Sequence, residues 1–128
     1  MEYRVCRNNP APYNDLNGKI SLLGLGTMRL PLRDAADQTS IDEEKAQEIF
    51  DYAYAHGVNY FDTAYPYHGG MSEKFCGKAL AKYPRAIYHL ASKLPGWLLK
   101  CDEDVPRIFN EQLANCCTDY FDFYLVHS

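Results

Sequence analysis

The chain has 128 residues, of which 47% are hydrophobic and 23% are charged, a balance typical of one globular domain rather than of a disordered or fibrous segment. The formal net charge is −4 and the basic residues do not cluster, which argues against nucleic acid or an anionic membrane as a partner. No window approaches the roughly 18 apolar residues of a membrane span, and the polar first residues are unlike a signal peptide. We therefore expect a cytoplasmic protein.

The five cysteines show neither a C-x-x-C pair nor a histidine at zinc-finger spacing. We expect them to be buried, reduced thiols, which suits a reducing compartment, and we assign no metal site. They are Cys6, Cys76, Cys101, Cys116 and Cys117.

Turn-forming residues dominate the beginning of the chain. Asn17-Gly18 is the strongest tight-turn signal there and predicts a short N-terminal hairpin or arm over residues 1–18. The apolar run from Ile20 to Gly26, closed by glycines, has the length and composition of a buried strand. We expect it to be the first strand of the main body, which spans residues 19–128.

A helix is predicted after a polar loop. Ser40 and Glu43 have the S-x-x-E spacing of a capping box, which marks the start of a helix. Gly57 is the candidate C-cap at its end. Apolar residues between these points recur at three- and four-residue steps and form one buried stripe, made of Ala46, Ile49, Phe50, Ala53 and Tyr54.

Three further strands alternate with two further helices. The strands are expected over residues 58–61, 86–91 and 121–126, and the helices over about 72–82 and 104–116. Single crossover helices between successive strands predict a parallel sheet with right-handed connections. Two closures remain open, a doubly wound sheet and part of an eightfold (β/α) barrel. A dinucleotide-binding G-x-G-x-x-G motif is excluded because Arg29 stands where its third glycine is needed.

Three predicted strands end at an ionisable residue, Asp62, Lys93 and His127. The carboxyl ends of parallel strands lie on one face, where barrel and open-sheet enzymes place their chemistry, so these side chains are expected to converge. Charges directly after apolar runs also mark ordinary strand exits, and position alone leaves both interpretations open.

A proton donor near Asp62, Lys93 and His127 would complete a catalytic site. Tyr67 lies five residues after Asp62, and an adjacent ammonium such as Lys93 favours the phenolate and eases proton transfer from a phenol. Asp62 would pair with Lys93, and His127 would donate a hydrogen bond to a substrate oxygen. Tyr65 in the same loop is an equal candidate on spacing alone.

The chain resembles the aldo-keto reductase family over nearly all of residues 19–128. Four stretches carry the likeness in the family's order and spacing: Leu23-Gly24-Leu25-Gly26-Thr27-Met28-Arg29-Leu30-Pro31, Gly57-Val58-Asn59-Tyr60-Phe61-Asp62-Thr63-Ala64-Tyr65-Pro66-Tyr67 with Ser72-Glu73, Ala91-Ser92-Lys93-Leu94, and Asp119-Tyr120-Phe121-Asp122-Phe123-Tyr124-Leu125-Val126-His127-Ser128.

The resemblance implies a parallel (β/α) barrel of TIM type that reduces aldehydes and ketones with NADP(H), NAD(H) being the alternative. It implies a catalytic tetrad of Asp62, Tyr67 as general acid, Lys93 and His127, and it selects Tyr67 over Tyr65. By the same resemblance, the residues that approach the nicotinamide are Gly26, Thr27, Met28 and Asp62.

About four strands and three helices are predicted, whereas such a barrel typically takes about 250 residues. The resemblance therefore predicts only the N-terminal half, apparently truncated, whose open edges would allow self-association. The expected partner is a small carbonyl compound. Some bacterial or archaeal members carry an additional iron-sulfur domain, which these residues do not test.

Two alternative functions remain open. The first is a non-catalytic half-barrel, either a remnant or a regulatory binding subunit. The second is a barrel enzyme that uses Lys93 for Schiff-base chemistry, which leaves Tyr67 and His127 without a role. His68 is a candidate for lining the substrate mouth, and Trp97 either walls an apolar pocket or packs its own loop.

Overall fold

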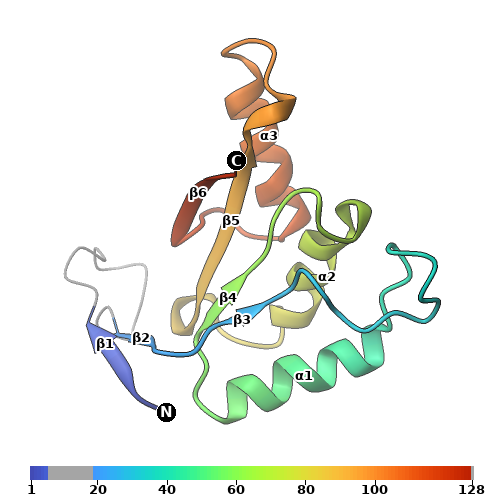
Figure 1. Ribbon diagram of the computed structural model, residues 1–128. Helices are drawn as coiled ribbons and strands as arrows, with labels where there is room; N and C mark the ends of the chain where they lie inside the picture. The colour runs from blue at the N-terminus through green and yellow to red at the C-terminus, as the bar shows by residue number, and fades with distance from the viewer. Residues whose placement is uncertain (6–18, 128) are drawn as a thin grey trace.

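The computed structural model describes residues 1–5 and 19–127 (Figure 1). The expected Asn17-Gly18 turn and Cys6 lie outside these residues. The strands and α-helices of the described part, in chain order, are β1 (Tyr3–Val5), β2 (Lys19–Ser21), β3 (Leu25–Gly26), α1 (Glu43–Ala55), β4 (Tyr60–Asp62), α2 (Met71–Leu80), β5 (His89–Pro95), α3 (Asp104–Asn115) and β6 (Phe123–His127). None of these helices is long and apolar enough to cross a membrane.

The main sheet has the order β3-β4-β5-β6, and every neighbouring pair is parallel. One helix connects each strand to the next, and the three helices lie on the same side of the sheet (Figure 1). This is the parallel α/β arrangement that the alternating pattern predicts. Within the described residues, β3 and β6 are the two edges. The strands β1 and β2 form a separate antiparallel pair.

The apolar run over residues 20–26 is not one strand, as predicted, but two strands in different sheets. Asn59 binds Ser21 at the break, because its Oδ1 accepts from the Ser21 backbone N–H at 2.8 Å and its backbone N–H donates to Ser21 Oγ at 3.1 Å. These bonds hold β2 against the start of β4. Leu22 and Leu23 are then left exposed between the two strands.

The helix α1 begins with a different cap from the predicted one. Asp42 is the N-cap, and its Oδ1 accepts from the backbone N–H of Lys45 at 3.3 Å. Ser40 instead closes the preceding loop, since its hydroxyl accepts from the Asp34 N–H at 3.0 Å. The predicted end of the helix is confirmed, because Gly57 follows it with φ +90°, a conformation that favours glycine.

The strand β5 begins and ends later than the predicted 86–91. Residues 85–87 form a 3-10 turn, and Arg85 Nη1 donates to the Tyr88 carbonyl at 3.0 Å, which ties the turn to the start of the strand. The helix α3, by contrast, matches its prediction closely.

A buried ion pair joins β5 to the segment before β6. Asp122 Oδ2 accepts from Arg85 Nη2 and from the Leu90 backbone N–H, both at 2.7 Å, and the carboxylate is only 2% exposed. Burial alone would raise the pKa of Asp122. Hydrogen bonds from His89 and Leu90 and the charge of Arg85 outweigh that effect, so its pKa is lowered.

The hydrophobic core lies between the sheet and the helices α1 and α2. Phe50 of α1 stacks on Phe61 of β4 at 5.3 Å between ring centres and meets Phe75 of α2 edge-on at 5.5 Å. Phe50 and Phe61 are fully buried. Because burying such a ring contributes about 1.5–3 kcal/mol, this cluster fixes the helices against the strands that present the candidate site.

The cysteine prediction is half correct. All four described cysteines are free, but only Cys76 and Cys116 are buried, whereas Cys101 and Cys117 are exposed. Burial raises the pKa of the Cys76 thiol to about 12, although hydrogen bonds with neighbouring hydroxyl groups oppose the shift.

Candidate active site

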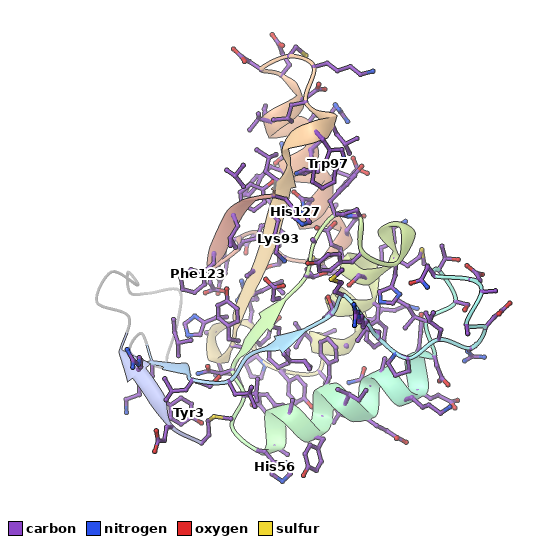
Figure 2. The ribbon with its side chains drawn as sticks, in the orientation of Figure 1. Tyr3, His56, Lys93, Trp97, Phe123 and His127 are labelled. Carbon is purple, nitrogen blue, oxygen red and sulfur yellow. The ribbon has the colours of Figure 1, made fainter. Side chains whose placement is uncertain are left out.

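The parallel sheet brings the predicted site residues to its carboxyl end. Asp62 is the last residue of β4, Lys93 lies within β5 and His127 is the last residue of β6. Gly26 ends β3 and pairs in register with Asp62. In Figure 2, Lys93, His127 and Trp97 lie together near the C-terminal end of β5.

Lys93 holds the centre of the site. Its Nζ lies 2.7 Å from Asp62 Oδ2 and donates to the Thr63 carbonyl at 2.8 Å. The side chains of Lys93 and Asp62 are 13% and 28% exposed, so the pair is partly shielded from water. Because water screens a partly shielded pair less, the electrostatic attraction between Lys93 and Asp62 exceeds that of a pair on the open surface. The Thr63 carbonyl, as the second acceptor, fixes the direction of the Lys93 ammonium.

The structure distinguishes the two tyrosines that spacing alone left equal. The Lys93 Nζ lies 4.8 Å from the centre of the Tyr67 ring, a cation–π contact. Tyr65 instead donates its hydroxyl proton to Glu111 Oε1 at 3.0 Å. Partial burial and the contact with Glu111 raise the pKa of Tyr65. Tyr67 is therefore the tyrosine that contacts the lysine.

His127 joins the same cluster through aromatic contacts. Its ring meets Tyr67 edge-on, with 6.0 Å between ring centres and 89° between planes, and it meets Trp97 at 5.1 Å. His127 Nδ1 is buried and has no hydrogen-bond partner among the described residues. The tautomer with its proton on Nε2 avoids a buried donor without an acceptor and keeps a donor for another group.

His68, a candidate for lining the substrate mouth, has a structural position instead. It is 5% exposed, its Nδ1 hydrogen-bonds the Gln38 carbonyl at 2.8 Å and its Nε2 accepts from the Leu30 N–H at 3.1 Å. Its φ of 54° is unusual for a residue with a side chain. These bonds hold the loop after β3 and use both ring nitrogens of His68.

The predicted nicotinamide-binding residues differ in how they are presented. Gly26 is exposed, and a Cβ atom there would meet no heavy atom within 4 Å, while Met28 is 59% exposed. Gly26 pairs with Asp62 across the sheet, so its open face lies beside that residue. Thr27 is fully buried, and its hydroxyl donates to the Asp62 carbonyl at 3.0 Å. Its backbone N–H also donates to the Asp62 carbonyl at 3.0 Å, so both polar donors of Thr27 are already used to join the end of β3 to β4.

Two residues that contact Lys93 were missed in the sequence. The Thr63 carbonyl accepts from its ammonium, and Gln112 Nε2 of α3 donates to its main-chain carbonyl at 3.0 Å. A main-chain acceptor has no residue signature. Gln112 lies 19 residues from Lys93, inside an amphipathic helix, so only the folded arrangement reveals it.

Comparison with known proteins identifies a family. Residues 22–128 match the model of the Aldo/keto reductase family. The chain is 31% identical over 135 residues to Protein tas of Escherichia coli, covering 91% of this chain and 36% of that protein. It is 33% identical over 115 residues to L-galactose dehydrogenase of Arabidopsis thaliana, covering 85% and 34%. The chain thus spans about a third of the length of these curated relatives.

Solved structures agree and decide between the two closures of the sheet. The aldo-keto reductase AKR11C1 from Bacillus halodurans, in its holo form, matches with a TM-score of 0.71 and 30% identity over 98% of this chain and 40% of that chain. An aldo-keto reductase from Klebsiella pneumoniae in complex with NADPH matches with a TM-score of 0.66 and 25% identity over 99% and 40%. The four strands are the N-terminal half of a parallel (β/α) barrel of TIM type, and the chain belongs to the aldo/keto reductase family.

Proposed function

We propose that this protein takes part in the NADPH-dependent reduction of an aldehyde or ketone to an alcohol, with a site formed by Asp62, Tyr67, Lys93 and His127. The observation that carries the proposal is the convergence of these residues. Lys93 Nζ lies 2.7 Å from Asp62 and 4.8 Å from the Tyr67 ring centre, and His127 meets the same ring. Family membership and the NADPH complex of the Klebsiella protein support it.

In this proposal Tyr67 donates the proton to the carbonyl oxygen. Gly26 and Asp62 would hold a reduced nicotinamide, whose chemistry would be the supply of a hydride to the carbonyl carbon. Negative charge then develops on the carbonyl oxygen, and a proton donor and a hydrogen-bond donor placed at that oxygen stabilise it. His127 provides the second donor through Nε2, and Lys93 provides a positive charge beside the phenol that loses its proton.

Asp62 and the Thr63 carbonyl fix the direction of the Lys93 ammonium. Removing the carboxylate would leave a partly buried ammonium without a counter-charge, an arrangement that costs several kcal/mol when burial is complete. NADP(H) is the proposed cofactor because the Klebsiella relatives bind NADPH and NADP, and NAD(H) is the alternative to be tested beside it.

The test compares Tyr67→Phe with the matched control Tyr65→Phe in the same loop. Each variant removes one phenol hydroxyl, but only Tyr67 contacts Lys93. We expect Tyr67→Phe to lower carbonyl reduction by at least about 100-fold, since general acid catalysis contributes 10²–10⁴-fold, with NADPH binding unchanged by fluorescence titration. Tyr65→Phe should keep at least half of the turnover. Equal turnover in both variants would refute the assignment.

A second candidate is a non-catalytic half-barrel that binds a partner or a nicotinamide without turnover. NADPH titration of the 128-residue chain separates the candidates. Saturable binding with turnover supports the reductase. A folded chain that does not reduce a panel of aldehydes supports the second candidate, whether or not it binds NADPH.

A further inference from the structure

The first turn of α2 carries two polar side chains that are almost completely buried. Ser72 and Glu73 are 0% and 1% exposed, yet neither contacts the side chains of Asp62, Tyr67, Lys93 or His127. The ion pairs of the described residues do not include Glu73. Because a buried carboxylate without a cation is costly, its neighbours must provide the stabilisation.

Glu73 anchors the strand that presents Lys93. Its Oε1 accepts from Ser92 Oγ and from Gln112 Nε2, both at 2.7 Å, and its Oε2 accepts from Asn115 Nδ2 at 3.1 Å. The same Gln112 Nε2 also donates to the Lys93 carbonyl at 3.0 Å. The carboxylate therefore holds Ser92 directly by its side chain, and through Gln112 it is linked to the main chain of Lys93.

Tyr124 of β6 binds the oxygen of the Gln112 amide, whose nitrogen binds Glu73. Its hydroxyl donates to Gln112 Oε1 at 2.5 Å, which fixes the orientation of the amide and turns its NH₂ toward Glu73. Burial and the charge of Glu73 raise the pKa of Tyr124 to about 12, so the hydroxyl remains a donor.

Ser72 anchors the residues that receive the Lys93 ammonium. Its hydroxyl lies 2.7 Å from Thr27 Oγ1 and 2.9 Å from Thr63 Oγ1. With the Thr27 hydroxyl proton directed to the Asp62 carbonyl, Thr27 accepts from Ser72 and Ser72 accepts from Thr63. The three hydroxyls form a chain with one direction, from Thr63 through Ser72 and Thr27 to the Asp62 carbonyl.

We propose that Ser72 and Glu73 are positioning residues that set the place of the Lys93 ammonium between Asp62 Oδ2 and the Thr63 carbonyl. Ser72 holds the two acceptors, and Glu73 holds the strand that brings the donor. This inference rests on the proposed function for its catalytic meaning, but the geometry that it assigns can be tested without turnover. It makes the first turn of α2 a support for the site, although α2 contributes no group to the chemistry.

The test follows the ¹H–¹⁵N signal of the Lys93 ammonium, which is visible when hydrogen bonds slow its exchange with water, and which Lys93→Met assigns by its disappearance. Glu73→Gln keeps the shape but places an NH₂ group against a donor, since both carboxylate oxygens only accept. Ser72→Ala removes one hydroxyl and interrupts the chain. Asn59→Ala is the matched control, because Asn59 is equally buried and hydrogen-bonded but lies at the opposite end of the sheet.

We expect Glu73→Gln and Ser72→Ala to weaken the ammonium signal at least fivefold, Ser72→Thr to restore it, and Asn59→Ala to leave it within twofold despite a similar loss of stability. If Glu73→Gln does not fold, the loss of the signal in Ser72→Ala and its return in Ser72→Thr test the inference. If the unsubstituted chain reduces carbonyls, Glu73→Gln and Ser72→Ala should each lower kcat at least tenfold relative to it, while KM for the carbonyl substrate stays within twofold. A signal retained in Ser72→Ala, lost equally in Asn59→Ala, or absent from the unsubstituted chain would overturn the inference. If turnover is absent while the signal responds as expected, the proposed function fails and the positioning stands.

Discussion

The contribution of the buried Arg85–Asp122 pair can be worked out from its geometry. Asp122→Ala removes the acceptor of the Arg85 guanidinium and of the Leu90 N–H, both at 2.7 Å. Breaking a fully buried pair costs about 3–5 kcal/mol, but Arg85 is 20% exposed, so water recovers part of that cost. Leaving the Leu90 N–H without an acceptor adds about 1–3 kcal/mol. With about 2–3 kcal/mol left for the partly exposed pair, we expect a total loss of about 3–6 kcal/mol in the free energy of unfolding.

Asp122→Asn separates the charge from the hydrogen bonds. The amide oxygen can take the place of Oδ2 and accept from both Arg85 and Leu90, so this variant should lose only about 1–2 kcal/mol. Urea unfolding followed by far-ultraviolet circular dichroism measures both values. A loss below about 1 kcal/mol for Asp122→Ala, or equal losses for the two variants, would refute the reasoning.

Asp122→Asn should also change how the stability of the fold depends on pH. The folded state lowers the pKa of Asp122, so its contribution to stability is present above the unfolded pKa and is lost as the pH falls through the lower folded value. Stability of the unsubstituted chain should therefore decline below about pH 4, and the decline should be shallower in Asp122→Asn. Thermal unfolding at pH 2.5, 4 and 7 measures the difference.

Two further predictions concern a backbone position and the thiols. Gly57→Ala should cost about 1–3 kcal/mol, because φ there is +90°, whereas Gly26→Ala, where a Cβ meets nothing within 4 Å, should stay within about 0.5 kcal/mol in urea unfolding. In a Cys6→Ser background, a thiol reagent should modify Cys101 and Cys117 within minutes and the two buried cysteines only as fast as the chain unfolds, so four fast thiols would contradict the structure.

Local patterns predicted much of the framework correctly. The apolar stripe and Gly57 located α1, since a helix needs one buried face and a residue that tolerates positive φ at its end. The strand-end charges also met as expected. In a parallel pair neighbouring strands are in fixed register, and Asp62 opposes Ala91, two residues before Lys93 on the same face of β5.

Contacts between distant residues explain what the patterns missed. The run over residues 20–26 is apolar apart from Ser21 and its glycines, and the partner that holds Ser21 in a separate strand pair is Asn59, 38 residues further along the chain. Capping also depended on context, because Ser40 had closer partners within its own loop. Buried polar residues such as Glu73 look like ordinary surface residues of a helix until the third helix packs against them.

Trp97 has a practical consequence for measurements on this protein. It is the chain's only tryptophan, it is about half exposed, and its ring lies 5.1 Å from that of His127. Tryptophan emission therefore reports on the carboxyl end of the sheet and not on the core around Phe50. Unfolding curves from emission and from circular dichroism should coincide only if the molecule unfolds as one unit, and an earlier emission change would reveal local opening at the site.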